Sequence, residues 1–377
     1  MKVYFDNAAT TPLHPDVIKD ISQQMAINFG NPSSSHQFGR HAKNLVESAR
    51  KSIAKNLKCA PNEIIFTAGG SEADNLILRN AVENLGVKRI ISSTVEHHAV
   101  LHMIDALKIA YNTEVSYVNL TENGAVDLTY LESLLKDTTQ KTLVSLMYIN
   151  NEIANLLPLK TVADLCKTYD AYFHSDTVQA IAHYDINLED IPVDFIAASA
   201  HKFHGPKGVG FAFMRKKYGI KPLLIGGEQE HGARAGTENT HSIAGMALAF
   251  DLAIKDLEKD QAYVSHLKKY FVEKLKEIIP DVQFNGLSAD LKKSSYVTLS
   301  VRFSKEIPML LFKLDLKGIA ASGGSACQSG SSKGSHVLQA ILSSAEAQKS
   351  SVRFSFSKFN TLAEVDYTIL ILKTLLN

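Results

Sequence analysis

The chain has 377 residues, of which 45% are hydrophobic and 21% are charged, proportions that are ordinary for a globular protein. This length exceeds the needs of one small core and indicates two domains. The formal net charge is +1, from 40 basic and 39 acidic residues, which gives no electrostatic basis for binding nucleic acid or an anionic membrane surface.

Cysteine usage and hydropathy narrow the class of protein further. Cys59, Cys166 and Cys327 lie far apart, so they form neither a disulfide framework nor a paired metal-binding motif. No apolar run reaches the ~18 residues that cross a bilayer, and the start MKVYFDNAATTP lacks the apolar segment of a secretory signal. We therefore expect a cytoplasmic protein without a membrane partner.

The first two thirds of the chain alternate between helical and strand patterns. Apolar residues at helical spacing over 42–57 predict an early helix. From about residue 63 to 215, apolar runs alternate with helical stretches such as 74–85 and 162–169, and this repetition predicts a mainly parallel sheet covered by helices. The predicted strands are 63–67, 89–93, 114–120, 143–149, 171–174, 195–198 and 210–214.

The remaining third has a different pattern, typical of a smaller α+β domain. It opens with a long helical stretch over 241–279 that could bridge two domains. The elements predicted after it are a strand at 296–303, a helix at 307–316, a Gly/Ser-rich loop at 322–335, a short helix at 336–342, a strand at 352–356 and a helix at 362–376. We expect a large domain over 15–250 and a small domain that combines 1–14 with 251–377.

Lys202 lies in the segment SAHKFHGPKGVG, directly after an apolar strand. Ligands collect at the carboxyl ends of strands in α/β sheets, and a lysine in a confined polar setting there can form a Schiff base. The same glycine-rich segment is equally typical of a surface lysine in a strand–turn–strand. Taken alone, the segment supports both interpretations.

Two further strand ends carry groups that would complement a pyridoxal phosphate (PLP) site. Asp176, in HSDTVQA, could keep the pyridine nitrogen of PLP protonated, although in isolation the motif is better explained by a helix-capping or loop aspartate. In TAGGSEADN, Ser71 and Asp74 resemble a capping box that opens a helix. The free backbone N–H groups of such a helix start bind phosphate, although an ordinary capped helix has the same pattern.

Three other side chains have reactive or binding character. His97 or His98, in TVEHHAV, could stack on a planar ring or transfer a proton. Cys327 lies among small residues in SGGSACQSGSS, which favours a reactive thiol, whereas Cys59 and Cys166 lie in helical, partly apolar contexts and are interpreted as structural. Arg353 lies on a predicted strand and suits bidentate capture of a carboxylate, or a structural ion pair.

Taken together, these segments resemble the NifS-like cysteine desulfurases of the class V aminotransferase family. The resemblance runs from residue 4 to about 360 and implies a PLP-dependent transferase of fold type I, with an α/β large domain and a smaller C-terminal domain. The matching segments, in chain order, are YFDNAATTP, FGNPSSSH, FTAGGSEADN, TVEHHAVL, NNEIA, HSDTVQA, SAHKFHGPKGVG, RAGTENT, SGGSAC and VRFSFSKF.

The resemblance also implies a role for each matching residue toward the cofactor. Lys202 would carry PLP as a Schiff base, His97 would stack on its ring and move protons, Asp176 would pair with the pyridinium nitrogen, and Gln179 would contact the phenolate oxygen. The phosphate would be held by Gly70, Ser71, Ser199 and His201, and by Thr237 from a second subunit. A homodimer with shared active sites follows from that last role.

For the substrate L-cysteine, the resemblance implies that Asn151 and Arg353 bind the carboxylate, with Asn151 also touching the cofactor. Cys327 would be the nucleophile, taking the sulfur as a persulfide and leaving L-alanine. The sulfur would pass to an acceptor such as an iron–sulfur scaffold protein, or toward tRNA thiolation.

Some positions depart from the family pattern. In the segment GGEQEHGARAGT these are Glu228 and His231, and after Cys327 they are the residues KGS at 333–335. These departures concern loop conformation and local charge and leave the reaction class unchanged.

Other functions remain open at this stage. A selenocysteine lyase of the same fold differs only in its substrate, whereas an aminotransferase has no need of Cys327. A thiol hydrolase using Cys327 would leave Lys202 and Asp176 unexplained. A catalytically silent sulfur-relay partner would have no use for the full set of reactive positions.

Overall fold

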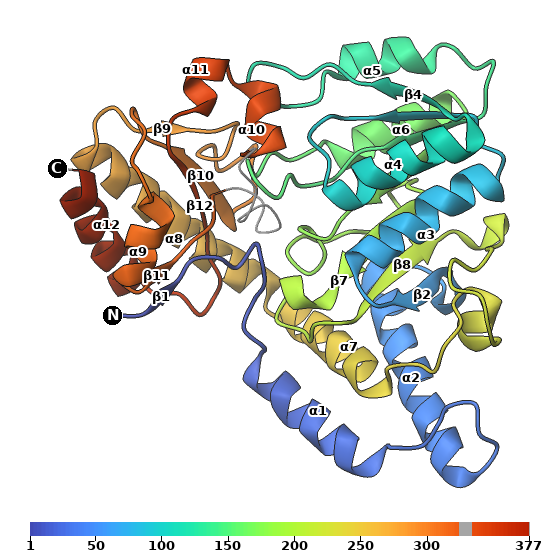
Figure 1. Cartoon of the computed structure of the whole chain (residues 1–377). Coiled ribbons are helices and arrows are strands. Elements are labelled where there is room, and N and C mark those ends of the chain that lie inside the picture. Colours follow the sequence, from blue (N-terminus) through green and yellow to red (C-terminus); the bar gives the residue numbers. More distant parts are fainter. Residues whose placement is uncertain (324–333, 377) are drawn as a thin grey trace.

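The computed structural model describes residues 1–323 and 334–376. Figure 1 shows a larger body built around one sheet and a smaller body that contains both chain termini. Within the described ranges, no helix is long and apolar enough to cross a membrane. Cys327 lies outside the described residues.

The larger body is organised by a seven-stranded sheet with the strand order β2-β8-β7-β6-β5-β3-β4. Strand β8 runs antiparallel to both neighbours, and the other pairs are parallel, as the prediction of a mainly parallel sheet required. The strands are β2 (Ile64–Thr67), β3 (Arg89–Ser92), β4 (Glu114–Tyr117), β5 (Thr142–Ser145), β6 (Tyr172–Asp176), β7 (Phe195–Ser199) and β8 (Gly210–Met214).

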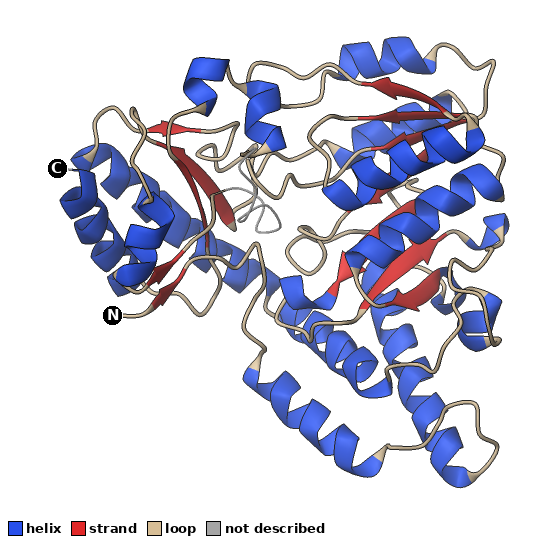
Figure 2. Ribbon diagram, in the orientation of Figure 1, coloured by secondary structure: helices blue, strands red, loops and turns tan. Residues whose placement is uncertain are grey.

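Helices cover both faces of this sheet (Figure 2). Side chains alternate between the faces of a strand, so Phe195 of β7 lies in the core that includes residues of α3 and α4, while Ile196 lies in the core that includes residues of α2, α6 and α7. The helices of this body are α1 (Pro15–Ile27), α2 (Gln37–Leu57), α3 (Gly70–Glu83), α4 (His98–Tyr111), α5 (Leu128–Leu135), α6 (Leu159–Thr168) and α7 (Thr240–Lys255). Short 3₁₀ turns lie at Pro61–Glu63, Ala200–Lys202, Lys216–Tyr218 and Gln229–Gly232.

The smaller body has its own core, to which both ends of the chain contribute. Phe5 from the N-terminal segment packs edge-on against Phe271 and Phe356. Its strands are β9 (Gln283–Phe284), β10 (Thr298–Arg302) and β12 (Ser351–Ser355), which form an antiparallel sheet, and the parallel pair β1 (Val3–Tyr4) and β11 (Ile319–Ala320). Its helices are α8 (Leu257–Ile278), α9 (Leu310–Leu316), α10 (His336–Ile341), α11 (Ser344–Ala347) and α12 (Leu362–Leu376).

The structure corrects several of the predicted elements. The helical stretch over 241–279 is two helices, because the chain leaves helical geometry at Asp256; Phe250 of α7 then packs in the large core and Phe271 of α8 in the small one. The strand expected over 114–120 ends at Tyr117, and the strand expected over 143–149 ends at Ser145. There the N–H of Met147 donates to the Glu96 carboxylate instead of a strand carbonyl. The domain boundaries stay a prediction.

Candidate active site

A cavity of about 220 Å³ lies where the carboxyl ends of β6 and β7 meet the start of α3 and the N-terminal segment. Strands β6 and β7 are parallel neighbours, so the residues that follow them end at one edge of the sheet, as expected for a ligand site in an α/β fold. The cavity brings together the predicted residues Gly70, Ser71, His97, Asn151, Asp176, Gln179, Ser199, His201, Lys202 and Arg353.

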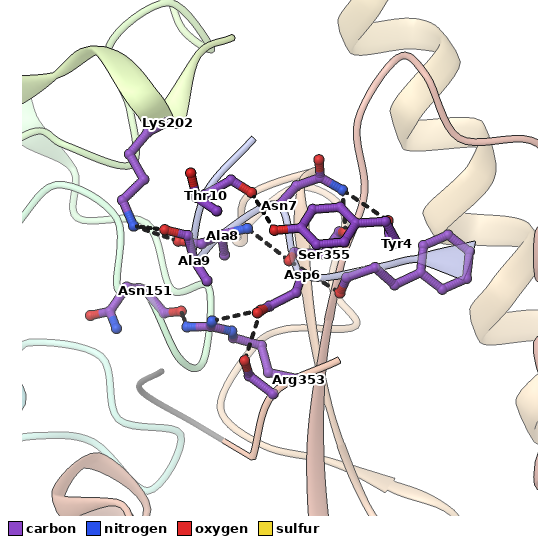
Figure 3. Close-up of polar contacts among 12 residues, drawn as sticks. Tyr4, Asp6, Asn7, Ala8, Ala9, Thr10, Asn151, Lys202, Arg353 and Ser355 are labelled. Atoms are coloured by element: carbon purple, nitrogen blue, oxygen red, sulfur yellow. Dashed lines mark hydrogen bonds and ion pairs between the residues drawn. The ribbon is translucent and has the colours of Figure 1, made fainter. Parts of the chain in front are cut away.

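Lys202 ends the 3₁₀ turn that follows β7. Its Nζ donates to the carbonyl oxygen of Ala8 at 2.7 Å and to that of Ala9 at 2.8 Å (Figure 3). Gln179 also donates to Ala8, at 3.0 Å. The N-terminal segment therefore fixes the lysine amine at the cavity, where a covalently attached ligand could be held.

Asp176 is the last residue of β6 and is buried beneath the cavity. Its Oδ1 accepts a hydrogen bond from the Val178 N–H at 2.9 Å. Burial raises the pKa of this carboxyl, while His97, the Val178 N–H and Lys202 act in the opposite direction. A buried carboxylate of this kind favours a cationic partner, which a protonated pyridine nitrogen would supply.

The start of α3 supplies open backbone donors, but not in the predicted way. The capping box of Ser71 and Asp74 is absent, because α3 begins at Gly70 with Gly69 as a cap that has no side chain to bond the first turn. Asp74 is instead buried inside the helix. An uncapped helix start leaves N–H groups free to bind an anion.

These donors face a second, adjoining cavity of about 470 Å³, lined by Gly70, Ser71, Ser199 and His201. Burial, Lys202 and Lys207 lower the pKa of His201 to about 4. A methyl group at Gly70 would lie 2.5 Å from Val178 Cγ2, so glycine is the residue that fits there. Helix N–H groups, a hydroxyl and an imidazole are donors suited to a phosphate.

His97 caps the start of α4, and its Nδ1 accepts the Ala99 N–H at 3.1 Å. The neutral ring therefore carries its hydrogen on Nε2. Burial, with smaller contributions from Lys202 and His336, lowers the pKa of this imidazole despite the nearby Asp176. A neutral imidazole at the cavity can accept or give a proton within one catalytic cycle.

Arg353 lies on β12 with 2% of its surface exposed. Its Nη1 donates to the Asn151 carbonyl at 2.8 Å, and its Nη2 to Asp6 Oδ1 at 3.1 Å (Figure 3). Among the described residues, its Nε has no hydrogen-bond partner. A buried guanidinium with donors to spare at a cavity suits a carboxylate ligand.

Two predicted site residues are not in this constellation. Thr237 is exposed and lines neither cavity of its own chain, and Cys327 lies outside the described residues. The other two cysteines match their structural interpretation. Burial and Glu63 raise the pKa of the Cys59 thiol to about 12, and burial raises that of Cys166 further.

Sequence reasoning missed the N-terminal contribution to the site. Ala8 and Ala9 line the cavity and hold Lys202, and Asp6 holds Arg353. The motif YFDNAATTP was part of the resemblance, but nothing in its local pattern assigns a contact. The sequence pattern assigns Asp74 only a capping role, although this residue too lines the cavity.

Comparisons with known proteins agree with this arrangement. The aminotransferase class-V family model matches residues 3–368. A protein of Dictyoglomus turgidum named cysteine desulfurase IscS is 39% identical over 383 residues, covering 100% of this chain and 94% of that protein. A solved NifS-like protein is 34% identical with a TM-score of 0.91, covering 100% of this chain and 99% of its own. A structure described as SspA in complex with cysteine is 29% identical with a TM-score of 0.79, covering 96% of this chain and 100% of that chain.

The fold and these matches define a PLP-dependent enzyme of fold type I, as the resemblance implied. The chain belongs to the class-V aminotransferase family and, within it, to the cysteine desulfurases. The lysine amine, the buried carboxylate and the uncapped helix start of the cavity fit PLP, the cofactor of that family.

Proposed function

We propose that the chain takes sulfur from L-cysteine, holds it as a persulfide on Cys327 and passes it to an acceptor protein in the cytoplasm. The observation that supports this most directly is that Lys202, Asp176 and Arg353 line one cavity. One bound amino acid could then reach all three groups: the Lys202 amine for the cofactor, the Asp176 carboxylate for its ring and the Arg353 guanidinium for the substrate.

The cofactor would be held by the residues of the two adjoining cavities. Lys202 would attach it covalently, Asp176 would pair with its ring nitrogen, and Gln179 would contact its phenolate oxygen. Gly70, Ser71, Ser199 and His201 would hold the phosphate, and Asn151 would contact the cofactor as well as the substrate. When bound, PLP supplies an electron sink for the bonds at the substrate α-carbon.

The remaining residues would handle the substrate. Arg353 and the Asn151 side chain would bind its carboxylate and fix its orientation. Neutral His97 would hold or move a proton at Nε2. The Cys327 thiolate would attack the substrate sulfur, so that a sulfur–sulfur bond forms as the carbon–sulfur bond breaks. The carbon keeps the bonding pair and gains a proton, which gives L-alanine and a Cys327 persulfide.

A homodimer would complete the site. Apolar side chains of α1, of the loop after it and of the start of α2 are exposed in the single chain. Phe29 of the loop and Phe38 of α2 pack on each other at 5.2 Å between ring centroids. Leu224 and Ile225 are exposed on the segment that leads to Thr237. Pairing these surfaces would bury them and could bring Thr237 to the phosphate of the partner subunit. The exposed apolar residues of α1, of the loop that follows it and of the start of α2 are Ile18, Met25, Ile27, Phe29 and Phe38.

The sulfur acceptor is proposed to be an iron–sulfur scaffold protein, or a relay toward tRNA thiolation. Mass spectrometry after mixing the persulfide-loaded enzyme with each candidate would identify the acceptor by its gain of one sulfur atom. Comparing turnover of L-cysteine with that of L-selenocysteine separates the desulfurase from a selenocysteine lyase.

The central experiment measures L-alanine and sulfide formed from L-cysteine with a thiol reductant present, since sulfide release from a persulfide consumes reductant. We expect Cys327→Ala to keep PLP and lose both products. Cys59→Ala is the matched control, because its thiol is half-buried with a raised pKa, and it should retain activity. Normal turnover by Cys327→Ala would overturn the assignment.

A further inference from the structure

Asp6 connects two parts of the molecule that the proposed mechanism treats separately. Its Oδ1 accepts a hydrogen bond from Arg353 Nη2 at 3.1 Å and another from Ser322 Oγ at 2.8 Å. Arg353 is the proposed carboxylate-binding residue, and Ser322 stands five residues before Cys327 in the sequence. One carboxylate oxygen therefore binds both.

The backbone strengthens this junction. Ser322 and Arg353 form an isolated antiparallel bridge, with the Arg353 N–H donating to Ser322 and the Ser322 N–H donating to Arg353 at 3.2 Å. Asp6 in turn pairs with Ser355, two residues along β12 from Arg353. Figure 3 shows the N-terminal segment between Lys202 and Arg353. Three segments far apart in the sequence thus meet at Arg353: Asp6 binds its side chain, and Ser322 binds its backbone.

The Arg353 guanidinium has donors left for a ligand. It carries N–H groups on Nε, Nη1 and Nη2, and its described contacts use one from each Nη. Nε–H has no hydrogen-bond partner among the described residues, although the side chain is only 2% exposed. The contact with Asp6 thus orients the guanidinium without saturating it. A substrate carboxylate would place a second anion on the group that Asp6 already binds.

We infer that Asp6 is a positioning residue that orients Arg353 for the substrate carboxylate and couples occupancy of Arg353 to the constraint on Ser322. This inference rests on the proposed role of Arg353. When a substrate carboxylate binds the Arg353 guanidinium, the positive charge of the guanidinium interacts with two anions, the substrate carboxylate and Asp6. The Asp6–Arg353 bond weakens, and the same oxygen becomes a stronger acceptor for the Ser322 hydroxyl. Substrate binding is then transmitted to the segment that leads to Cys327.

The affinity test titrates the holoenzyme with L-alanine, followed by the cofactor absorbance. Alanine has the substrate carboxylate but no sulfur to transfer, so its binding can be measured independently of desulfurase activity. A chain that releases no sulfide from L-cysteine would overturn the proposed function, but this test could still be carried out on it. We expect Asp6→Ala to weaken binding about tenfold, as the loss of one charge-assisted hydrogen bond predicts. Asp6→Asn keeps an oxygen acceptor and should stay within about threefold of wild type.

Tyr4→Phe is the matched control for this test. It removes a hydrogen bond of 2.7 Å between Tyr4 and the Thr10 carbonyl in the same segment, without touching Arg353 or Ser322, and should leave alanine affinity unchanged. Equal affinities for wild type, Asp6→Ala and Tyr4→Phe would overturn the positioning role. So would equal losses in Asp6→Ala and Tyr4→Phe, since both would then reflect the integrity of the segment alone.

The coupling is tested by hydrogen exchange of the Ser322 amide, with and without L-alanine. Alanine should change the exchange rate in wild type, and this response should disappear in Asp6→Ala. Ser322→Ala, measured at residue 322 in the same way, should also lose the response while keeping alanine affinity, and it carries the test if Asp6→Ala does not fold. The coupling would be overturned if alanine left the exchange rate of the wild-type Ser322 amide unchanged. It would also be overturned if alanine still changed the exchange rate at residue 322 in Ser322→Ala.

Discussion

Asp74 Oδ1 lies 3.3 Å from His174 Nε2, and both side chains are buried beneath the cofactor cavity. His174 also contacts Ser145 through Nδ1 at 2.9 Å. Burial, with Asp176 and Glu96 nearby, raises the pKa of Asp74 well above its usual value of 3.8, and burial lowers the pKa of His174 to about 3. Burial thus favours the neutral form of both groups over the charged pair.

This relationship predicts how the stability of an Asp74→Asn variant depends on pH. Because the pKa of Asp74 is higher in the folded chain than in the unfolded one, its protonation stabilises the fold fully below pH 3.8, and this contribution is lost as the pH rises through the folded value. Asparagine is neutral throughout. The unfolding temperature of Asp74→Asn, relative to wild-type apoprotein, should therefore rise from pH 5 to pH 8. A difference that stays constant over this range would contradict the assignment.

The position of Lys202 predicts the site of covalent attachment. Borohydride reduction of the PLP-loaded wild type should fix the cofactor to Lys202, and peptide mass spectrometry should locate it there. Lys202→Ala should show no such adduct. Lys216→Ala removes an exposed lysine just after the next strand and should be labelled like wild type. An adduct on any other lysine would show that the carrier has been misassigned.

The tight packing of Gly70 predicts the effect of adding one methyl group. A Cβ at this position would lie 2.5 Å from Val178 Cγ2, so Gly70→Ala must displace the start of α3 or Val178. Overpacking of this kind costs about 1–3 kcal/mol, and PLP affinity should fall by about tenfold or more. Equilibrium titration of the apoprotein with PLP measures the change. The double variant Gly70→Ala, Val178→Ala should recover much of the affinity, and a double variant as weak as Gly70→Ala would exclude this clash as the cause.

The sequence predicts those parts of the site that follow from local pattern. Lys202 and Asp176 could be placed because each follows an apolar strand, and parallel strands end at the same edge of a sheet. The contacts of the N-terminal segment could not be placed in this way. Asp6 and Arg353 are separated by 347 residues, and their meeting depends on how β1 and β12 pack in the smaller body, which no local periodicity encodes.

The errors at helix boundaries have a similar origin. Ser71 and Asp74 have the spacing of a capping box, but the glycine pair before them extends the helix start, so that Asp74 is buried against His174 instead of capping. Over 241–279 the apolar pattern continues across Asp256, although α7 and α8 pack on different cores. In both cases tertiary packing overrides a pattern that is locally sound.

The segment that leads to Thr237 depends on a buried ion pair. The Glu230 carboxylate accepts hydrogen bonds from Arg50 Nη1 and Nη2, each at 2.8 Å, and from the Phe66 N–H at 2.8 Å. Both side chains are 3% exposed. The backbone of Glu230 and of His231 is left-handed, so these contacts hold a strained turn in place. His231, which departs from the family pattern, is exposed and leaves this ion pair intact.

Removing one member of the pair should be strongly destabilising. In Glu230→Ala the Arg50 guanidinium stays buried without its counter-charge, and we expect a loss of about 3–5 kcal/mol. Glu47→Ala is the matched control, because Glu47 is the other carboxylate that pairs with Arg50 and its side chain is 35% exposed. This substitution should cost about 1 kcal/mol or less. Glu230→Gln keeps the acceptor for Phe66 and should fall between them. Urea unfolding of the apoproteins measures all three, and similar losses in Glu230→Ala and Glu47→Ala would show that the buried pair does not hold this turn.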